Sequence, residues 1–218
     1  SQAPALQAEP RALYELVRAH DVTALRRALM QTLLRRGLGH FVTEVAQPLL
    51  VEIGEAWARG QLEVFEEHLC SEALETVLRA AIATAPEVRA DGSPRVLLTT
   101  FPGEQHGLGL LMAEALLTLE GASCMNLGCQ TPLPDIVAAA QAHCADVVAL
   151  GFSLVSPPGA SLDHLAELRE RLTGPVEIWA GTPLAAMQRR GAGGVLMLGE
   201  LNRIHDEVGR WRSRSAVP

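Results

Sequence analysis

Residues 95–109 read RVLLTTFPGEQHGLG, and this stretch decides the fold of the second half of the chain. Its first part, 96–100, is short and rich in apolar and β-branched residues, as in a strand covered on both faces. A glycine-rich loop follows, and an apolar segment of helical period then runs to Leu119. The stretch therefore predicts a strand, a loop and a helix in succession.

The same alternation continues to the end of the chain. Further strands are expected at 124–127, 147–150, 176–179 and 195–198, and further helices up to about 143, at 161–172, from 184, and up to 212. Apolar strands separated by helices predict an α/β fold, a flavodoxin-like (Rossmann-type), doubly wound, five-stranded parallel sheet over residues 94–214. For the strand order 2-1-3-4-5, ligands bind beyond strands one and three, so loops 101–109 and 152–158 are expected to hold the site.

The first half of the chain has a helical period throughout. Its helices are expected on either side of Asp21, which can cap the second, then at 40–57 with a bend at Pro48, and at 62–85. Consecutive helices with short connections predict a four-helix bundle over residues 6–88. The polar, turn-forming segment 87–94 predicts the domain boundary.

The composition is that of a compact cytoplasmic protein. Of 218 residues, 48% are hydrophobic and 20% charged, with no apolar run of membrane-spanning length and no secretory signal. The net charge is −7 without a continuous basic face, so direct nucleic-acid binding by this chain is not expected. The four cysteines form no C-x-x-C pair and are expected to be reduced thiols. The residues expected to be solvated surface or helix ends are Arg189, Arg190, Arg210, Arg212, Arg214, His20, His40, His143, His164 and His205.

The loop after the first strand carries a candidate metal ligand. His106 follows Glu104 by two residues and lies between glycines, which let a backbone approach a flat ligand or a phosphate. An imidazole at the mouth of a sheet, held by a carboxylate through its other nitrogen, is a metal-ligand arrangement. A histidine that caps a helix, or a glycine loop that cradles phosphate at a helix N-terminus, would have the same local spacing. The spacing alone leaves these alternatives open.

The pattern Glu104-x-His106-x-x-Gly109 after a first strand resembles the signature of the base-off, His-on cobalamin-binding domains. The resemblance implies that His106 ligates cobalt from below. The segment Leu127-Gly128-x-x-Thr131-Pro132 is also similar to that family, whereas Phe152-Ser153-Leu154 departs from its Ser-x-Leu pattern and Ala180-Gly181 replaces its usual Gly-Gly. The cofactor contacts that the resemblance implies in this half are Glu104, Gln105, His106, Gly107, Gly109, Thr131, Ser153, Leu154, Ser156 and Gly181.

A second motif lies in the predicted bundle, where nine residues separate Trp57 from Glu67-His68. On a helical hairpin these side chains can face one side and form a lid over a ligand. The alternative is a core tryptophan beside a solvated Glu-His pair. Phe65, three residues before His68, shares its helix face and is either another wall of the lid or an ordinary core residue.

The two motifs in this order are similar to CarH-type cobalamin photoreceptors, and the resemblance covers nearly the whole chain. It implies adenosylcobalamin between the bundle and the sheet domain, with Trp57 against the adenosyl group. It also implies that light breaks the cobalt–carbon bond, that the bundle shifts, and that His68, paired with Glu67, takes the upper axial position. The resemblance thus implies a light-dependent homo-oligomer that is a sensor and not an enzyme.

The role of His68 separates the competing functions. A corrin fills four equatorial positions of cobalt, so the protein acts through the two axial ones. A corrinoid methyl-carrier protein for a methyltransferase system is the alternative, but it needs an open upper face that a ligating His68 would obstruct. A flavodoxin-like phosphate or nucleotide binder with an unrelated bundle is a third possibility, and it predicts no corrin binding.

The output and a second chromophore are the remaining expectations from the resemblance. The family's transcription repressors carry a winged-helix DNA-binding domain before the bundle, and no such segment precedes Leu13. We therefore expect output through self-association or an unknown partner, with DNA involved only if a winged-helix domain is missing. Related standalone sensors, the photocobilins, also bind a bilin, so biliverdin is a second cofactor to test for, although no residue here establishes it.

Overall fold

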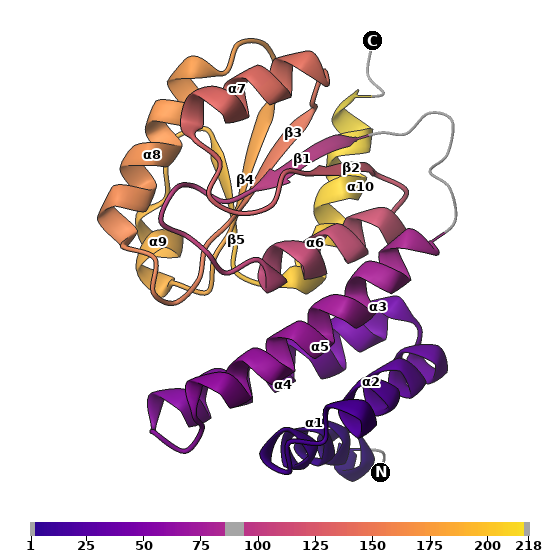
Figure 1. The fold of residues 1–218 in the computed structure, drawn as a ribbon. Helices are drawn as coiled ribbons and strands as arrows, with labels where there is room; N and C mark the ends of the chain where they lie inside the picture. The colour runs from indigo at the N-terminus through magenta and orange to yellow at the C-terminus, as the bar shows by residue number, and fades with distance from the viewer. Residues whose placement is uncertain (1–2, 86–93, 216–218) are drawn as a thin grey trace. The chain divides into compact units, whose positions relative to one another are not determined.

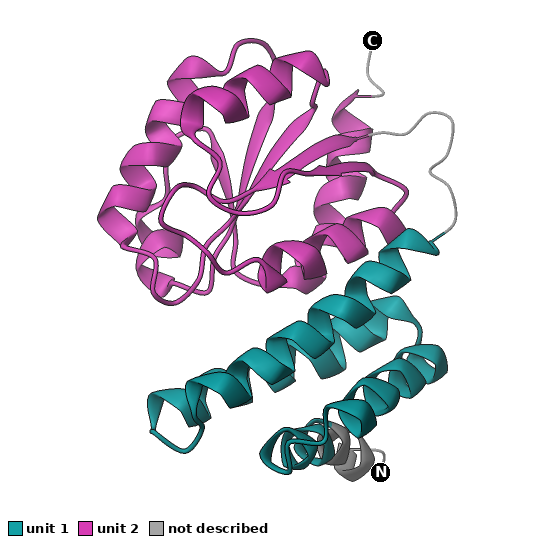
Figure 2. Ribbon diagram, in the orientation of Figure 1, with its two compact units in different colours: residues 1–85 teal, residues 86–218 magenta. Residues whose placement is uncertain are grey.

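The computed structural model describes residues 3–85 and 94–215, with side chains from residue 10 onward. The chain divides into two compact units, residues 1–85 and 86–218 (Figure 2). The predicted boundary at 87–94 lies, apart from Pro94, outside the described residues. Each unit encloses buried apolar side chains of its own.

The first unit is helical, as predicted. Its elements are α1 (Ala3–Arg18), α2 (Val22–Arg36), α3 (Leu38–Phe41), the π-helical turn η1 (Val42–Ala46), α4 (Gln47–Ala58) and α5 (Val64–Ala83) (Figure 1). Because α3, η1 and α4 follow one another without a break, they form one helical segment, and the unit is a bundle of four. Asp21 caps α2 as expected, since its Oδ1 accepts from Ala24 N at 2.8 Å.

The irregular turn of the third helical segment falls before Pro48 and not at it. Proline has no N–H to donate, and its ring crowds the carbonyl four residues earlier. In η1 the chain uses a wider turn, in which Gln47 N donates to Val42 O. Pro48 then stands in the first turn of α4, where a missing N–H is tolerated. The expected bend is therefore absorbed as a π-helical turn just upstream.

The second unit is a five-stranded parallel sheet in the order β2-β1-β3-β4-β5, which confirms the predicted fold class. The strands are β1 (Arg95–Thr99), β2 (Ser123–Asn126), β3 (Val147–Gly151), β4 (Glu177–Gly181) and β5 (Val195–Leu198). The helices are α6 (Leu108–Leu119), α7 (Leu133–Ala142), α8 (Pro158–Arg171), α9 (Ala185–Arg190), the 3-10 turn η2 (Leu201–Arg203) and α10 (Ile204–Ser215). The helix expected from residue 161 begins at Pro158, because the fixed φ of proline suits the first turn of a helix.

Helices cover both faces of the sheet (Figure 1). Alternate residues of β1 point to opposite sides, so Leu97 packs with the cluster of α7, α8 and α9, while Val96 and Leu98 pack with that of α6 and α10. This explains why the strands read as continuous apolar runs. No helix within residues 3–85 and 94–215 has both the length and the apolarity to cross a membrane.

Ile136 is a direct test of this packing, because it is fully buried between α7 and the sheet. We expect Ile136→Ala to lower the free energy of unfolding by about 3 kcal/mol through lost burial and a residual cavity. Leu119→Ala is the control, since Leu119 ends α6 with 47% of its surface exposed and should cost about 1 kcal/mol or less. Urea unfolding followed by circular dichroism measures both, and equal losses would contradict the assigned core.

Candidate functional site

The loops after β1 and β3 meet at the carboxyl edge of the sheet. Because β1 pairs with β3 in parallel, the two loops leave the sheet side by side. This is where the strand order reverses, and it is the place where open α/β sheets bind ligands. The structure thus brings together the two loops that the sequence predicted.

Glu104 is the centre of this edge. Its carboxylate is 6% exposed, and its Oε1 accepts from His106 N at 2.9 Å and from His106 Nδ1 at 2.6 Å. Its Oε2 accepts from Ser153 N at 3.0 Å, from Ser153 Oγ at 2.7 Å and from Ser156 Oγ. One buried carboxylate therefore joins the first loop to the third.

The same hydrogen bonds keep Glu104 ionised. Burial alone would raise its pKa, but the hydrogen bonds from Ser156, His106 and Ser153 outweigh burial and lower the pKa to about 2. An ionised carboxylate only accepts, so Nδ1 of His106 must carry the proton that it donates. The lone pair of the neutral imidazole is then on Nε2, on a side chain that is 62% exposed. The arrangement leaves the lone pair on Nε2 of His106 available to coordinate a metal.

Two threonines at the end of β1 hold the loop after β2 in place. Thr99 Oγ1 donates to Gly128 O at 2.8 Å and lies 2.7 Å from Thr131 Oγ1. Thr100 Oγ1 accepts from Gln130 N at 2.8 Å and donates to Glu104 O at 2.6 Å. Sequence reasoning missed both, although polar residues at the end of an apolar strand are a signal for the site edge.

The glycines of the first loop have different reasons to be glycine. A Cβ on Gly107 would lie 3.0 Å from Cys129 Sγ, so a larger residue there would need the cysteine side chain to shift. A Cβ on Gly109 would meet no protein atom within 4 Å, and a Cβ on Gly181 would meet only Leu150 O, at 3.8 Å. Packing within this unit therefore disfavours a side chain at Gly107 and leaves space beside Gly109.

Exposed apolar side chains lie on the loops at this edge of the sheet. Leu154 and Val155 are 73% and 68% exposed, and Leu127 is 37% exposed. A cavity of about 190 Å³ opens beside Glu104, with Phe101 and Phe152 among its walls. Gln105 and Gly181 are exposed, and Thr131 is half-buried. This end of the sheet offers one nitrogen donor within an apolar surface.

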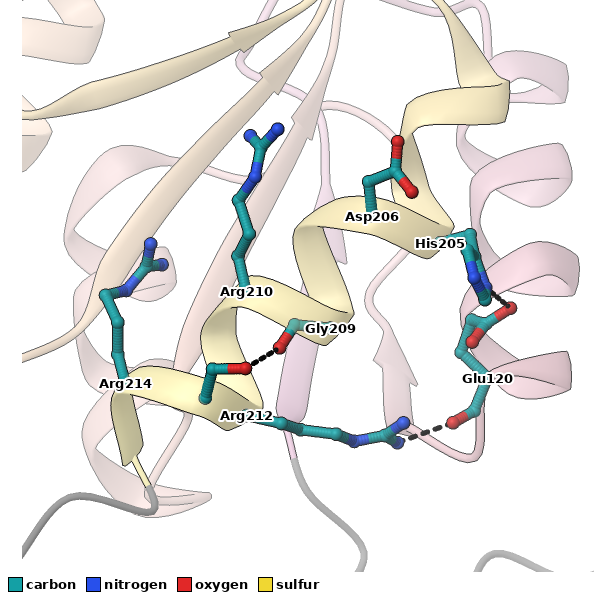
Figure 3. A pocket seen from close by; sticks show the side chains of 8 residues that line it. Glu120, His205, Asp206, Gly209, Arg210, Arg212 and Arg214 are labelled. Atoms are coloured by element: carbon teal, nitrogen blue, oxygen red, sulfur yellow. Dashed lines mark hydrogen bonds and ion pairs between the residues drawn. The ribbon is translucent and has the colours of Figure 1, made fainter.

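A larger hollow, of about 650 Å³, lies along α10 and is not the site (Figure 3). Its arginines are engaged within the unit, as Figure 3 shows for Arg212 and the backbone of Glu120. The other contacts are Arg210 with Glu207, Arg214 with Glu177, and His205 with Glu120. These residues remain surface, as the sequence predicted.

The helical unit presents a second imidazole of the same kind. His68 Nδ1 lies 2.5 Å from Glu67 Oε2, and Glu67 Oε1 accepts from Ser71 Oγ at 2.6 Å. The His68 side chain is 70% exposed. Trp57 and Phe65 are 48% and 51% exposed, so neither is a core residue. Of the predicted lid residues, Trp57, Phe65 and His68 are exposed on the helical unit, and Glu67 is half-buried.

Neither histidine belongs to a complete metal site. Within the described part of the chain, no three His, Cys, Asp or Glu residues group closely enough to hold a metal ion. One imidazole cannot hold a bare ion, but it suits a metal whose remaining positions are filled by a macrocycle. A single prepared nitrogen, apolar surroundings and space beside Gly109 fit such a cofactor.

The fold and this edge define a flavodoxin-like ligand-binding domain that offers one carboxylate-held imidazole to a metal cofactor. Comparison with known families agrees. Residues 94–202 match the B12 binding domain, and residues 11–82 match a second family that is also described as a B12 binding domain. The chain belongs to the B12-binding family and is a cobalamin-binding protein.

Individual relatives share parts of the chain. The HTH-type transcriptional repressor CarH of Myxococcus xanthus is 35% identical over 140 residues, which are 63% of this chain and 45% of the relative. Methionine synthase of Mycobacterium tuberculosis is 28% identical over 124 residues, 55% of this chain and 10% of that enzyme. The chain therefore spans less than half of either curated relative.

A solved structure shares the whole fold. The monomethylamine corrinoid protein of Methanosarcina barkeri superposes with a TM-score of 0.68 at 15% sequence identity, covering 90% of this chain and 94% of that one. At this identity the likeness concerns the fold alone.

The ionisation of Glu104 makes the free energy of unfolding depend on pH in the acidic range. Because its pKa falls from 4.5 to about 2 on folding, the ionised form stabilises the protein fully above pH 4.5 and loses this effect as the pH falls towards 2. The difference corresponds to about 3 kcal/mol. We expect Glu104→Gln to remove this part of the pH dependence in urea unfolding between pH 6 and about 3, while Glu167→Gln, whose side chain is 45% exposed, retains it. An unchanged slope in Glu104→Gln would contradict the assignment.

The tautomer of His106 is a second test. We expect ¹⁵N NMR at pH 8 to show Nδ1–H as the dominant form, because Glu104 accepts that proton. Glu104→Ala removes the acceptor and should shift His106 towards Nε2–H, whereas the signals of His205, which pairs with Glu120 instead, should not move. Nε2–H in the unmodified protein would be the opposite result.

Proposed function

We propose that this protein is a light-responsive adenosylcobalamin sensor. One observation carries the proposal: the two histidines that the sequence motifs single out are exposed and have Nδ1 held by a carboxylate, His106 by Glu104 and His68 by Glu67. His40 and His205 are held in the same way outside the motifs, so it is the motifs that select the pair. Two such nitrogens are what a corrin-bound cobalt can accept, because the corrin leaves only its two axial positions. Two histidines that can each coordinate cobalt through Nε2 support a change of axial ligand as the sensing step.

His106 is the proposed lower ligand. Its lone pair is on Nε2, and the loops that hold it are already joined by Glu104 and the two serines. Leu154 and Val155 offer apolar surface to the macrocycle, and Gly109 leaves space beside it. Gln105, Gly107, Thr131 and Gly181 are the further contacts that the family resemblance implies.

His68 is the proposed upper ligand after the adenosyl group leaves. Adenosylcobalamin supplies a cobalt–carbon bond that visible light breaks. In the dark, Trp57 and Phe65 would pack against the adenosyl group, which their exposed aromatic surface allows. Glu67 holds Nδ1 of His68, so Nε2 is the nitrogen left to coordinate. The movement that brings His68 to cobalt would change the oligomeric state or the contact with a partner.

A corrinoid methyl carrier is the second candidate. The match to methionine synthase supports it equally at the level of cobalamin binding, and the fold, shared with the monomethylamine corrinoid protein, is compatible with it. A carrier must leave its upper face open to a methyltransferase, whereas the pair of Glu67 and His68 would occupy that face. This pair is what favours the sensor.

The output of the sensor is also a proposal. The similarity to a transcriptional repressor suggests regulation of transcription, either through self-association or through a partner that binds DNA. Cytoplasmic location rests on the sequence alone, and a bilin as second chromophore rests on the family resemblance alone. Reconstitution with biliverdin, followed by its absorption band, tests the bilin separately from the corrin.

The decisive experiment is an absorption spectrum of the protein with adenosylcobalamin in darkness and after green illumination, with sizing chromatography of both samples. In air-saturated buffer, where dioxygen can take up the electron from the cobalt(II) that homolysis leaves, we expect a base-off, His-on dark spectrum that converts to a bis-imidazole cobalt(III) spectrum, with a change in size. His106→Ala should lose the dark His-on spectrum, and His68→Ala should lose only the illuminated product.

His205→Ala is the matched control, because His205 is also exposed and also held at Nδ1 by a carboxylate, at 2.8 Å. It should behave as the unmodified protein. An illuminated spectrum that is the same with and without His68 would favour the methyl carrier, and no corrin binding at all would exclude both functions.

A further inference from the structure

A buried carboxylate lies directly beside the Glu67–His68 pair and faces the opposite way. Glu66 is only 3% exposed, and its Oε1 lies 2.9 Å from His20 Nε2. Arg18 reaches the same carboxylate at 3.2 Å. Glu66, His20 and Arg18, here called the Glu66 cluster, join the end of α1 to the start of α5.

The Glu66 cluster also holds the loop between α4 and α5. Arg18 donates to Gln61 O at 2.9 Å, and Glu66 Oε2 accepts from Glu63 N at 2.8 Å, which closes a capping box on α5. The backbone amide of Glu63 and the His20 ring lower the pKa of Glu66, so the carboxylate is ionised near neutral pH. Several hydrogen bonds of the Glu66 cluster thus hold the turn between Trp57 and His68 in place.

His20 has a further contact that reaches the exposed face. Its ring packs edge-on against the ring of Phe65, with centroids 5.0 Å apart. His20 also has φ = 56°, a left-handed backbone conformation that residues other than glycine rarely adopt. The contacts of His20 with Glu66 and Phe65 can offset the energetic cost of this backbone conformation. Phe65 shares its helix face with His68, three residues on.

We propose that the Glu66 cluster is a positioning device for the upper ligand: Arg18, His20 and Glu66 fix the first turn of α5 and thereby the direction in which Phe65 and His68 project. This inference rests on the proposed function and deepens it. Neither Glu66 nor His20 touches the cofactor in this proposal. They act through the helix start, because a coordinating nitrogen that is misplaced by about 1 Å reacts far more slowly.

The first test needs no cofactor. We expect His20→Ala and Glu66→Gln to raise amide hydrogen exchange in residues 61–68 about tenfold. Glu66→Gln is nearly isosteric and can still accept from Glu63 N, so the fold should survive. Asp21→Ala is the matched control, since it removes the cap of α2 in the same turn and should raise exchange in α2 alone. Equal exchange in all variants, or the same increase in Asp21→Ala, would overturn the proposal.

The second test measures coordination without light. Protein mixed with aquacobalamin in darkness should form the bis-imidazole spectrum at a rate that His20→Ala and Glu66→Gln lower about tenfold. Uptake of the corrin through His106 should be unaffected, and Asp21→Ala should match the unmodified protein. Unchanged rates in both cluster variants would refute the positioning role.

The two tests separate this inference from the proposed function. If the unmodified protein forms no bis-imidazole spectrum that depends on His68, the proposed upper ligation fails, and the role of the cluster in coordination fails with it. The exchange experiment still decides whether the cluster orders the start of α5. A normal spectrum in the unmodified protein with no effect of the cluster variants overturns the inference alone.

Discussion

The sheet unit depends on one interaction, the burial of an ionised carboxylate between two loops. Glu104 is nearly excluded from solvent, and it stays charged only because His106, Ser153 and Ser156 donate to it. If one loop moved away, the remaining donors would not satisfy a buried charge, which is costly. The position of His106 and the packing of the third loop are therefore linked. The same carboxylate selects the tautomer of the imidazole, so one group fixes both the position of His106 and which of its nitrogens carries the proton.

In the helical unit, two neighbouring carboxylates share the roles that Glu104 combines, which are to fix the local structure and to hold an imidazole. Glu67 turns outward and holds Nδ1 of His68, whereas Glu66 turns inward to His20 and Arg18. Consecutive residues of a helix point about 100° apart, so adjacent glutamates can serve a surface and an interior at once. The two units thus use the same pairing of carboxylate and imidazole, but the bundle secures it through the start of a helix and the sheet through a meeting of loops.

The fold could be predicted from the sequence because periodicity is a local property. Apolar runs and helical repeats located every strand, and the rule for switch points selected two loops that the parallel pairing of β1 and β3 brings together. The contacts of Glu104 with Ser156 could not be predicted in the same way, because they join residues 52 apart in the chain. Those of Glu66 with His20 span 46 residues. The sequence around a loop serine or histidine does not indicate its distant partner, so such contacts become visible only in the three-dimensional structure.

The π-helical turn before Pro48 also sets the rotation of the residues that follow it in the same helical segment. A π-helical turn is equivalent to one residue inserted into an α-helix, and each residue of an α-helix advances the chain by about 100°. Everything that follows η1 in this segment, including Trp57 at its far end, is therefore rotated about the helix axis relative to α3. Loss of a single residue from 42–46 would restore a regular helix and turn the indole toward a different neighbour. The orientation of Trp57 is thus encoded by chain length upstream as much as by its own identity.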